Sequence, residues 1–161
     1  MKRIIAATVV AAALAAGNAQ AGQTSGTFNV NVTLTSTCTL SAVNDLAFTY
    51  TSLQGGASAA TGGGFSVSCT TSLPYTFALQ AGTPAGPFVA PFSTTLGPIT
   101  DSVVQLQYSL GLSANGGSGS GVAQNYSVTG SMAASQAGTC AAASCTNAGA
   151  TNRTHTLIVN Y

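Results

Sequence analysis

The residues of this chain that could carry out chemistry are few. His155 is the only imidazole, and Asp45 and Asp101 are the only carboxylate side chains. His155 stands beside the last apolar run, where a surface position is favoured over a role as general base. Asp45 and Asp101 each follow a turn-like stretch, so we interpret them as turn or strand-start residues and not as a catalytic pair. The sequence therefore predicts that this protein is not an enzyme.

Two glycine-rich stretches have the letters of functional motifs without their context. Residues 117–121 (GSGSG) match a nucleophile elbow, but they lie in a low-complexity loop and not between a strand and a helix. Residues 62–64 (GGG) have no following helix or lysine, so they predict a turn and not a phosphate loop. We expect no cofactor.

Four cysteines, an even number, are typical of disulfides in an exported chain. A zinc site is disfavoured because neither close pair has the two-residue spacing of zinc knuckles. Three connectivities are possible. A bridge between Cys38 and Cys69 would staple the ends of two alternating runs, with a gain of roughly 3 to 4 kcal/mol. Cys140 and Cys145 would then close a small loop, with a gain of about 2 kcal/mol.

The first 21 residues have the pattern of a cleavable secretory signal. Lys2 and Arg3 form a short basic start, residues 4–16 are apolar, and residues 19–21 (AQA) are the small residues that a signal peptidase accepts. The apolar run is shorter than the roughly 20 residues of a membrane-spanning helix. We expect residues 1–21 to be removed and no membrane anchor to be retained.

The rest of the chain, about 140 residues, has the size of one domain and carries almost no charge. Arg153 is its only strong cation, against the two aspartates, which leaves a net side-chain charge of −1. Nucleic-acid binding depends on Lys and Arg, and binding to a membrane surface needs a basic apolar face, so both classes are excluded. A freely diffusing secreted protein usually carries charge of both signs, whereas a subunit fixed in a fibre has less need of it.

Short runs of alternating apolar residues recur along the chain and predict β-strands. Clusters of Gly, Pro, Asn and Ser separate them, and no segment has the period of a helix. We expect an antiparallel β-sandwich almost without helix. The face of the strand at 103–112 would hold Val104, Leu106, Tyr108 and Leu110, and a flexible hairpin loop is expected at 115–121. The predicted strands are residues 27–35, 46–50, 65–69, 75–79, 103–112, 126–132 and 156–161.

The first of these strands is the most regular, although it lies near the chain start. Phe28, Val30, Val32 and Leu34 alternate with Asn and Thr, so all four apolar side chains share one face. Two interpretations stay open. The segment pairs within its own chain, as in an ordinary secreted domain, or its four side chains fill successive pockets in the groove of another molecule.

Three stretches of the chain resemble the spore coat protein U domain, the family that includes major pilins of archaic chaperone–usher fibres. They are GTFNVNVTLTSTCTLSA at residues 26–42, SAATGGGFSVSCTTSLPYTFALQAG at 58–82 and THTLIVNY at 154–161. There are two departures from the family pattern. Residues 152–156 (NRTHT) replace the usual Gly-x-Tyr-x-Asp-Thr, and the pair Cys140 and Cys145 enlarges the preceding loop.

The resemblance implies an immunoglobulin-like sandwich that lacks its last strand, with an apolar groove beside the C-terminal strand. A periplasmic chaperone fills this groove first, and at an outer-membrane usher the N-terminal extension of the next subunit replaces it. Residues 22–36 would be this donor extension and residues 37–161 the pilin domain. Leu157, Val159 and Tyr161, on one face of the last strand, would belong to the acceptor groove and to the strand that the chaperone binds. Copies would join head to tail into a filament.

The function implied by the resemblance is that of a structural subunit of a surface pilus, exported through the periplasm and supporting adhesion and biofilm formation. One alternative is a tip adhesin or carbohydrate-binding module, for which Phe88 and Phe92 in residues 86–92 (GPFVAPF) are the candidate aromatics. Another is a secreted spore-coat or matrix protein without an ordered fibre.

Overall fold

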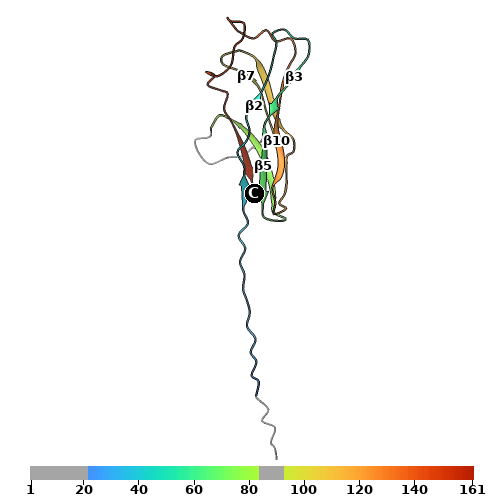
Figure 1. The fold of residues 1–161 in the computed structure, drawn as a ribbon, viewed down its shortest axis with the longest axis vertical. Helices are drawn as coiled ribbons and strands as arrows, with labels where there is room; N and C mark the ends of the chain where they lie inside the picture. The colour runs from blue at the N-terminus through green and yellow to red at the C-terminus, as the bar shows by residue number, and fades with distance from the viewer. Residues whose placement is uncertain (1–21, 84–92) are drawn as a thin grey trace, which may run out of the picture. The chain divides into compact units, whose positions relative to one another are not determined.

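The computed structural model of the chain describes residues 22–83 and 93–161 (Figure 1). The expected signal at 1–21 and the loop with Phe88 and Phe92 therefore lie outside the described residues. Residues 34–161 form one compact unit, and residues 22–33 belong to a separate N-terminal unit. The described residues contain eleven strands. No helix among them is long and apolar enough to span a membrane.

The strands pair into three antiparallel sheets. The largest has the order β1-β5-β10-β8-β7, with β3 also paired to β10, the second has the order β11-β6-β9, and the third is the pair β2-β4. Figure 1 shows β5 and β10 side by side in the largest sheet. The bounds are β1 Cys38–Leu40, β2 Leu46–Ala47, β3 Ser58–Ala59, β4 Thr61–Gly62, β5 Gly64–Cys69, β6 Pro74–Ala81, β7 Thr95–Thr100, β8 Gln107–Leu112, β9 Gly116–Ser118, β10 Gln124–Met132 and β11 His155–Asn160.

One apolar core joins the largest sheet to β6. Along β5 every second residue is buried, because successive side chains of a strand point to opposite faces. The fold is all-β, as predicted, with the antiparallel arrangement of an immunoglobulin-like sandwich. The buried cluster consists of Phe65, Val67 and Cys69 on β5, Tyr75, Phe77 and Leu79 on β6, Tyr108 and Leu110 on β8, and Val128 and Met132 on β10.

Aromatic contacts link the two layers at the centre of this core. The ring of Phe77 on β6 packs edge-on against Phe65 and Tyr126, with centroid distances of 5.3 and 4.8 Å. The Tyr75 and Tyr126 hydroxyls lie 2.6 Å apart, and Tyr75 donates a hydrogen bond to Gln124 at 3.0 Å. Burial, together with the hydrogen bond to Tyr126, raises the pKa of Tyr75 to about 12. Tyr75 therefore remains a neutral donor at physiological pH.

Four predicted strands are confirmed with small changes at their ends. Residues 65–69, 75–79, 126–132 and 156–161 correspond to β5, β6, β10 and β11. The strand predicted at 46–50 is present only as the two residues of β2. The prediction of a strand over 103–112 is wrong at its start, since β8 begins at Gln107. The Asp101 side chain accepts hydrogen bonds from the backbone N–H groups of Val103 and Val104, and this folds residues 101–106 into a turn.

The loop expected at 115–121 contains a short strand instead. Gly116–Ser118 form β9, which pairs with the start of β6. Gly116 has φ 145°, and a Cβ atom there would lie 2.7 Å from the Cα of Thr76, so only glycine permits this approach of the two backbones. Strands β1, β3, β4 and β7 were not predicted. Residues 27–35, by contrast, are not assigned to a strand.

The structure contains two disulfides, Cys38–Cys69 and Cys140–Cys145. Cys38 on β1 and Cys69 on β5 are directly opposite each other in the sheet, with Cα atoms 4.1 Å apart. The preceding residue is held as well, because the Thr37 carbonyl accepts a hydrogen bond from Thr70 N–H at 3.0 Å. The start of the compact unit is thus fixed to a strand inside the largest sheet.

We expect the Cys38→Ser/Cys69→Ser double variant to lose about 3 to 4 kcal/mol of unfolding free energy, because the bridge closes a loop of 31 residues in sequence separation. Urea unfolding followed by tyrosine fluorescence measures this loss, and a lower yield in the periplasm should accompany it. The control is Cys140→Ser/Cys145→Ser, whose loop is short and should account for about 2 kcal/mol. Equal midpoints for the first variant and the parent would contradict the role of the bridge.

Candidate functional site

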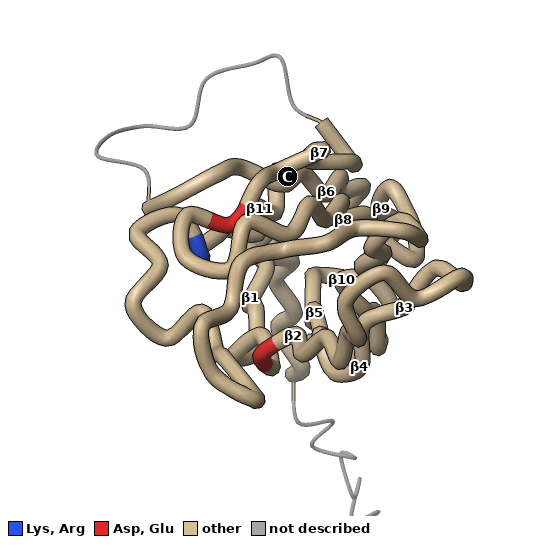
Figure 2. The backbone as a smooth tube through the Cα atoms, turned by 90° about the horizontal axis from the view of Figure 1, so that it is seen from above, with Lys and Arg blue, Asp and Glu red and all other residues tan. Residues whose placement is uncertain are grey.

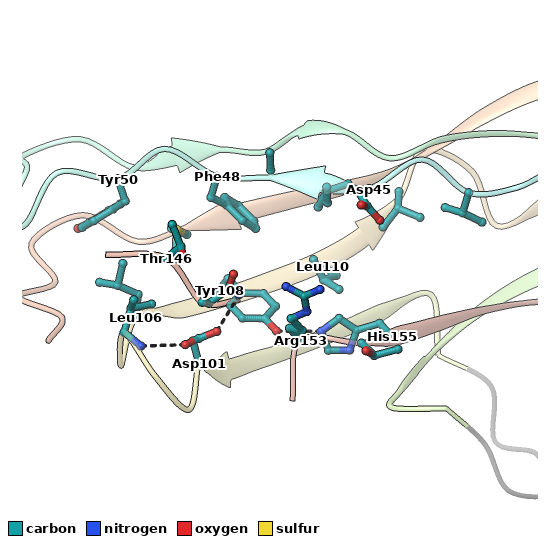
Figure 3. A pocket seen from close by; sticks show the side chains of 18 of the residues that line it. Asp45, Phe48, Tyr50, Asp101, Leu106, Tyr108, Leu110, Thr146, Arg153 and His155 are labelled. Carbon is teal, nitrogen blue, oxygen red and sulfur yellow. Dashed lines mark hydrogen bonds between the residues drawn. The ribbon is translucent and has the colours of Figure 1, made fainter. Parts of the chain in front are cut away.

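A groove of about 650 Å³ lies between β2 and β11 in the compact unit. One wall is formed by residues 43–50, which include β2, and the other by residues 153–157, at the start of β11. Figure 3 shows Phe48 and Tyr50 on one side, His155 and Arg153 on the other, and Tyr108 and Leu110 between them. The apolar floor consists of Leu79, Leu106, Tyr108, Leu110, Val128 and Met132.

The first wall rests directly on the largest sheet because β10 has a glycine at the point of contact. A Cβ atom on Gly130 would lie 2.5 Å from the Phe48 ring and 2.8 Å from a Leu46 methyl group. Leu46, Phe48 and Tyr50 alternate along the chain and are all half-buried against the core. The predicted 46–50 alternation therefore places three side chains in the groove, although only two residues are in a strand.

Three neighbouring rings, those of Phe48, Tyr108 and His155, lie across the groove. The Tyr108 ring lies 5.9 Å from Phe48 and 5.8 Å from His155 by centroid distance. The Tyr108 hydroxyl is hydrogen-bonded to His155 Nε2 at 2.8 Å. Burial raises the pKa of Tyr108 and lowers the pKa of His155, so both side chains are neutral near pH 7. The prediction of a surface position for His155 is wrong, since its ring is half-buried and its Nδ1 is buried without a hydrogen-bond partner.

The backbone of β11 has one unpaired edge along this groove. β11 is the end strand of the order β11-β6-β9, and the carbonyl of Thr154, the residue just before it, accepts a hydrogen bond from Gly82 N–H. Because backbone groups in an antiparallel ladder alternate between the two sides, the even-numbered residues of β11 face β6. The N–H and C=O groups of His155, Leu157 and Val159 therefore face away from β6, and no partner strand in the described residues pairs with them.

Asp101 organises the polar end of the groove. It is 2% exposed, and its Oδ1 accepts hydrogen bonds from the N–H groups of Val103 and Val104 at 2.8 and 2.9 Å. Its Oδ2 accepts a hydrogen bond from Asn147 Nδ2 at 2.9 Å. Burial alone would raise the pKa of Asp101, but the hydrogen bonds from Val104, Asn147 and Val103 outweigh it and lower the pKa.

The charged side chains of residues 22–161 all belong to the lining of this groove. They are Asp45, Asp101 and Arg153, and Figure 2 marks no other charged position in the described residues. Asp45 and Arg153 are exposed, and they lie on opposite walls in Figure 3. Within the described residues no three His, Cys, Asp or Glu side chains gather into a group that could hold a metal ion.

Most of the predicted acceptor residues lie in or beside the groove, and the predicted donor residues are exposed. Leu157 lines the groove, Val159 packs against the core beside it, and Tyr161 is 62% exposed and outside the lining. Val104, Leu106, Tyr108 and Leu110 all line the groove, although the first two precede β8. The apolar side chains of the N-terminal segment are exposed, with values of 86% for Phe28, 75% for Val30, 85% for Val32 and 77% for Leu34.

Sequence reasoning did not identify two parts of the lining. Phe48 and Tyr50 were predicted as strand residues without a role, and the Asp101 cluster with Asn147 was not expected. The position of Asp101 at a turn was a usable signal, because aspartate commonly accepts hydrogen bonds from the next backbone N–H groups. Asn147, 46 positions further along the chain, had no such local signal.

Comparison with known families identifies the family of this chain. The family model described as Spore Coat Protein U domain matches residues 24–157. The matched range includes the exposed N-terminal segment, both disulfides and most of the groove lining. Comparisons with curated proteins and with solved structures give no match.

We expect Asp101→Ala to lower the unfolding free energy by about 2 to 4 kcal/mol, because it leaves two backbone donors and Asn147 without their acceptor. Asp101→Asn is the matched control. It keeps the shape and one acceptor oxygen, and the Asn147 amide can rotate to restore its hydrogen bond, so the loss at neutral pH should be smaller. Urea unfolding at pH 7 measures both.

The same pair of proteins tests the ionisation of Asp101. A lowered pKa means that the carboxylate stabilises the fold above its unfolded-state value of about 3.9, and that this contribution is lost as the pH falls through the folded-state value. The unfolding free energy of the parent should therefore drop more steeply below about pH 4 than that of Asp101→Asn. Parallel pH profiles for the two proteins would contradict the charged assignment.

Proposed function

Because the chain belongs to the spore coat protein U domain family, we propose that it is a structural subunit of an extracellular pilus assembled by donor-strand exchange. The family is associated with chaperone–usher pili and fimbriae. The observation that carries the proposal is the apolar groove between β2 and the unpaired edge of β11. A strand added there would pair with β11 and cover the apolar floor, which is recognition by β-augmentation.

The proposed donor is the N-terminal segment of a second copy, with Phe28, Val30, Val32 and Leu34 facing the groove. Four lines of support agree. These side chains alternate with polar ones, they are largely exposed, the segment is not assigned to a strand, and it carries no charge that would oppose burial. Burying them would contribute roughly 6 to 12 kcal/mol as an upper estimate. Each net main-chain hydrogen bond adds about 1 kcal/mol.

The acceptor surface in this proposal includes Leu157 on the β11 wall and Leu46, Phe48 and Tyr50 on the β2 wall. Val159 extends the same face of β11 toward the chain end. A groove of this volume could also hold a small molecule. The open backbone edge favours an extended peptide, because a small molecule would leave the β11 N–H and C=O groups without a regular partner.

Assembly follows from the separation of the two surfaces. Donor segment and groove are different parts of one chain, so the contact is heterologous and repeats head to tail without closing. Before assembly a periplasmic chaperone would cover the groove, and an outer-membrane usher would exchange it for the donor. The assembled fibre would lie at the cell surface, where it would support adhesion and biofilm formation.

Deletion of residues 22–35 tests the donor assignment. The truncated subunit should still bind its chaperone, because the groove is intact, but it should form no fibres when it is the only subunit present. Co-purification with the chaperone and electron microscopy of surface material measure the two properties. Normal filaments from the truncated chain would count decisively against the proposal.

A pair of matched variants separates side-chain burial from segment length. Val30→Asn/Val32→Asn places polar groups on the proposed inward face and should abolish fibres or make them dissociate in mild denaturant. Asn29→Ala/Asn31→Ala changes the opposite face and should leave fibres intact. Equal effects of the two pairs, judged by the stability of oligomer ladders on unheated denaturing gels, would reject the assignment of faces.

A further inference from the structure

The connection between β10 and β11 is unusually long. It runs from residue 133 to residue 154 and contains neither strand nor helix. Connections longer than about 12 to 15 residues without secondary structure are uncommon in compact domains and are often functional. Its position is notable because it leads directly into the wall of the groove at residues 153–157.

This connection is held firmly at several points. The Cys140–Cys145 disulfide closes its middle, and Asn147 donates a hydrogen bond to the buried Asp101 carboxylate at 2.9 Å. Thr139 N–H donates to the Val104 carbonyl at 2.7 Å, and Asn152 Nδ2 donates to the Thr100 carbonyl at 2.7 Å. The loop is therefore tied at three points to the end of β7 and to the turn that follows it.

Part of the same loop forms one end of the groove. Cys145, Thr146 and Asn147 line it together with Asp101, close to the point where β11 begins. These residues present polar groups and a disulfide, whereas the floor beside them consists of leucines, Val128 and Met132. The groove thus changes from apolar to polar at this end. We call residues 140–147 the clipped loop.

An alternating segment can bind in an apolar groove in more than one register. A shift by one residue turns every apolar side chain outward and is excluded, but a shift by two keeps all of them on the same face. Residues 28–34 have an apolar side chain at every second position, so alternation alone does not select one register. Charge does not select one either, because residues 22–36 have no charged side chain.

We propose that the clipped loop is an end wall that fixes the register of the N-terminal segment from a second copy. The inference rests on the proposed function of the groove. Sliding the segment by two residues toward this end moves an apolar side chain from the leucine-lined floor against Thr146 and Asn147. The disulfide and the Asn147–Asp101 hydrogen bond hold the clipped loop in place. Because the loop cannot move aside, the shifted register is disfavoured.

Cysteine trapping in the full-length chain reads the register directly. Four chains carry Leu157→Cys in the groove and one cysteine at position 28, 30, 32 or 34, and each is assembled with its chaperone and usher under mild oxidation. Heated, non-reducing denaturing gels then measure the covalent ladder between copies. Each chain is compared with one that also carries Cys140→Ser/Cys145→Ser, and with one that also carries Asn147→Ala.

With the clipped loop intact, one of the four donor positions should give at least about ten times more ladder than the positions two residues away. When the loop is loosened by Cys140→Ser/Cys145→Ser or by Asn147→Ala, ladder should also appear at a position two residues away. A distribution that stays confined to one position in both opened variants overturns the end wall, and so does one that is already spread with the loop intact. Absence of ladder at all four positions, with fibres present, counts instead against the groove as the donor site.

Discussion

The constraint on which this structure depends is the unpaired backbone edge of β11. Backbone N–H and C=O groups need hydrogen-bond partners, and those of His155, Leu157 and Val159 that face away from β6 have none on another strand of the described residues. The sheets β2-β4 and β11-β6-β9 border the same groove without pairing to each other in the described residues. One added strand between β2 and β11 would join them into a single layer opposite the largest sheet. The proposed donor strand would occupy this position.

The scarcity of charge increases the cost of leaving this edge open. Proteins usually protect an edge strand with lysine, proline or inward-pointing charges. The sequence of β11, HTLIVN, has none of these, and in the described residues charge is confined to three side chains in the groove lining. An uncovered subunit would tend to aggregate through β11. In the proposed assembly the chaperone would cover this edge, and the same lack of protection would favour addition of the donor strand once the chaperone leaves.

The sequence predicted the parts of the fold that depend on local alternation. β5, β6 and β10 largely alternate between buried and more exposed residues, so period two was sufficient to find them. β11 was found from the same period in its sequence, although both of its faces are at least partly covered. β9 consists of Gly-Gly-Ser and is a strand only because β6 supplies its partner, and β7 contains Gly97 and Pro98, which argue against a strand locally. For the groove, Leu157 could be anticipated from its face of the last strand. The Asp101–Asn147 contact could not, because it joins residues that meet only after the long loop has folded.

The position of the Cys38–Cys69 bridge becomes intelligible if the N-terminal segment carries load between copies. Tension on an inserted segment would enter the compact unit through Thr37 and β1, which is an edge strand of three residues. Three residue pairs at the edge of a sheet are a weak attachment, since each net hydrogen bond contributes only about 1 kcal/mol. The disulfide connects β1 covalently to β5, which lies inside the largest sheet between β1 and β10. The force would then reach the core through a covalent bond. The first contact to break under tension would be that between the inserted segment and its groove, and not the attachment of β1 to the sheet.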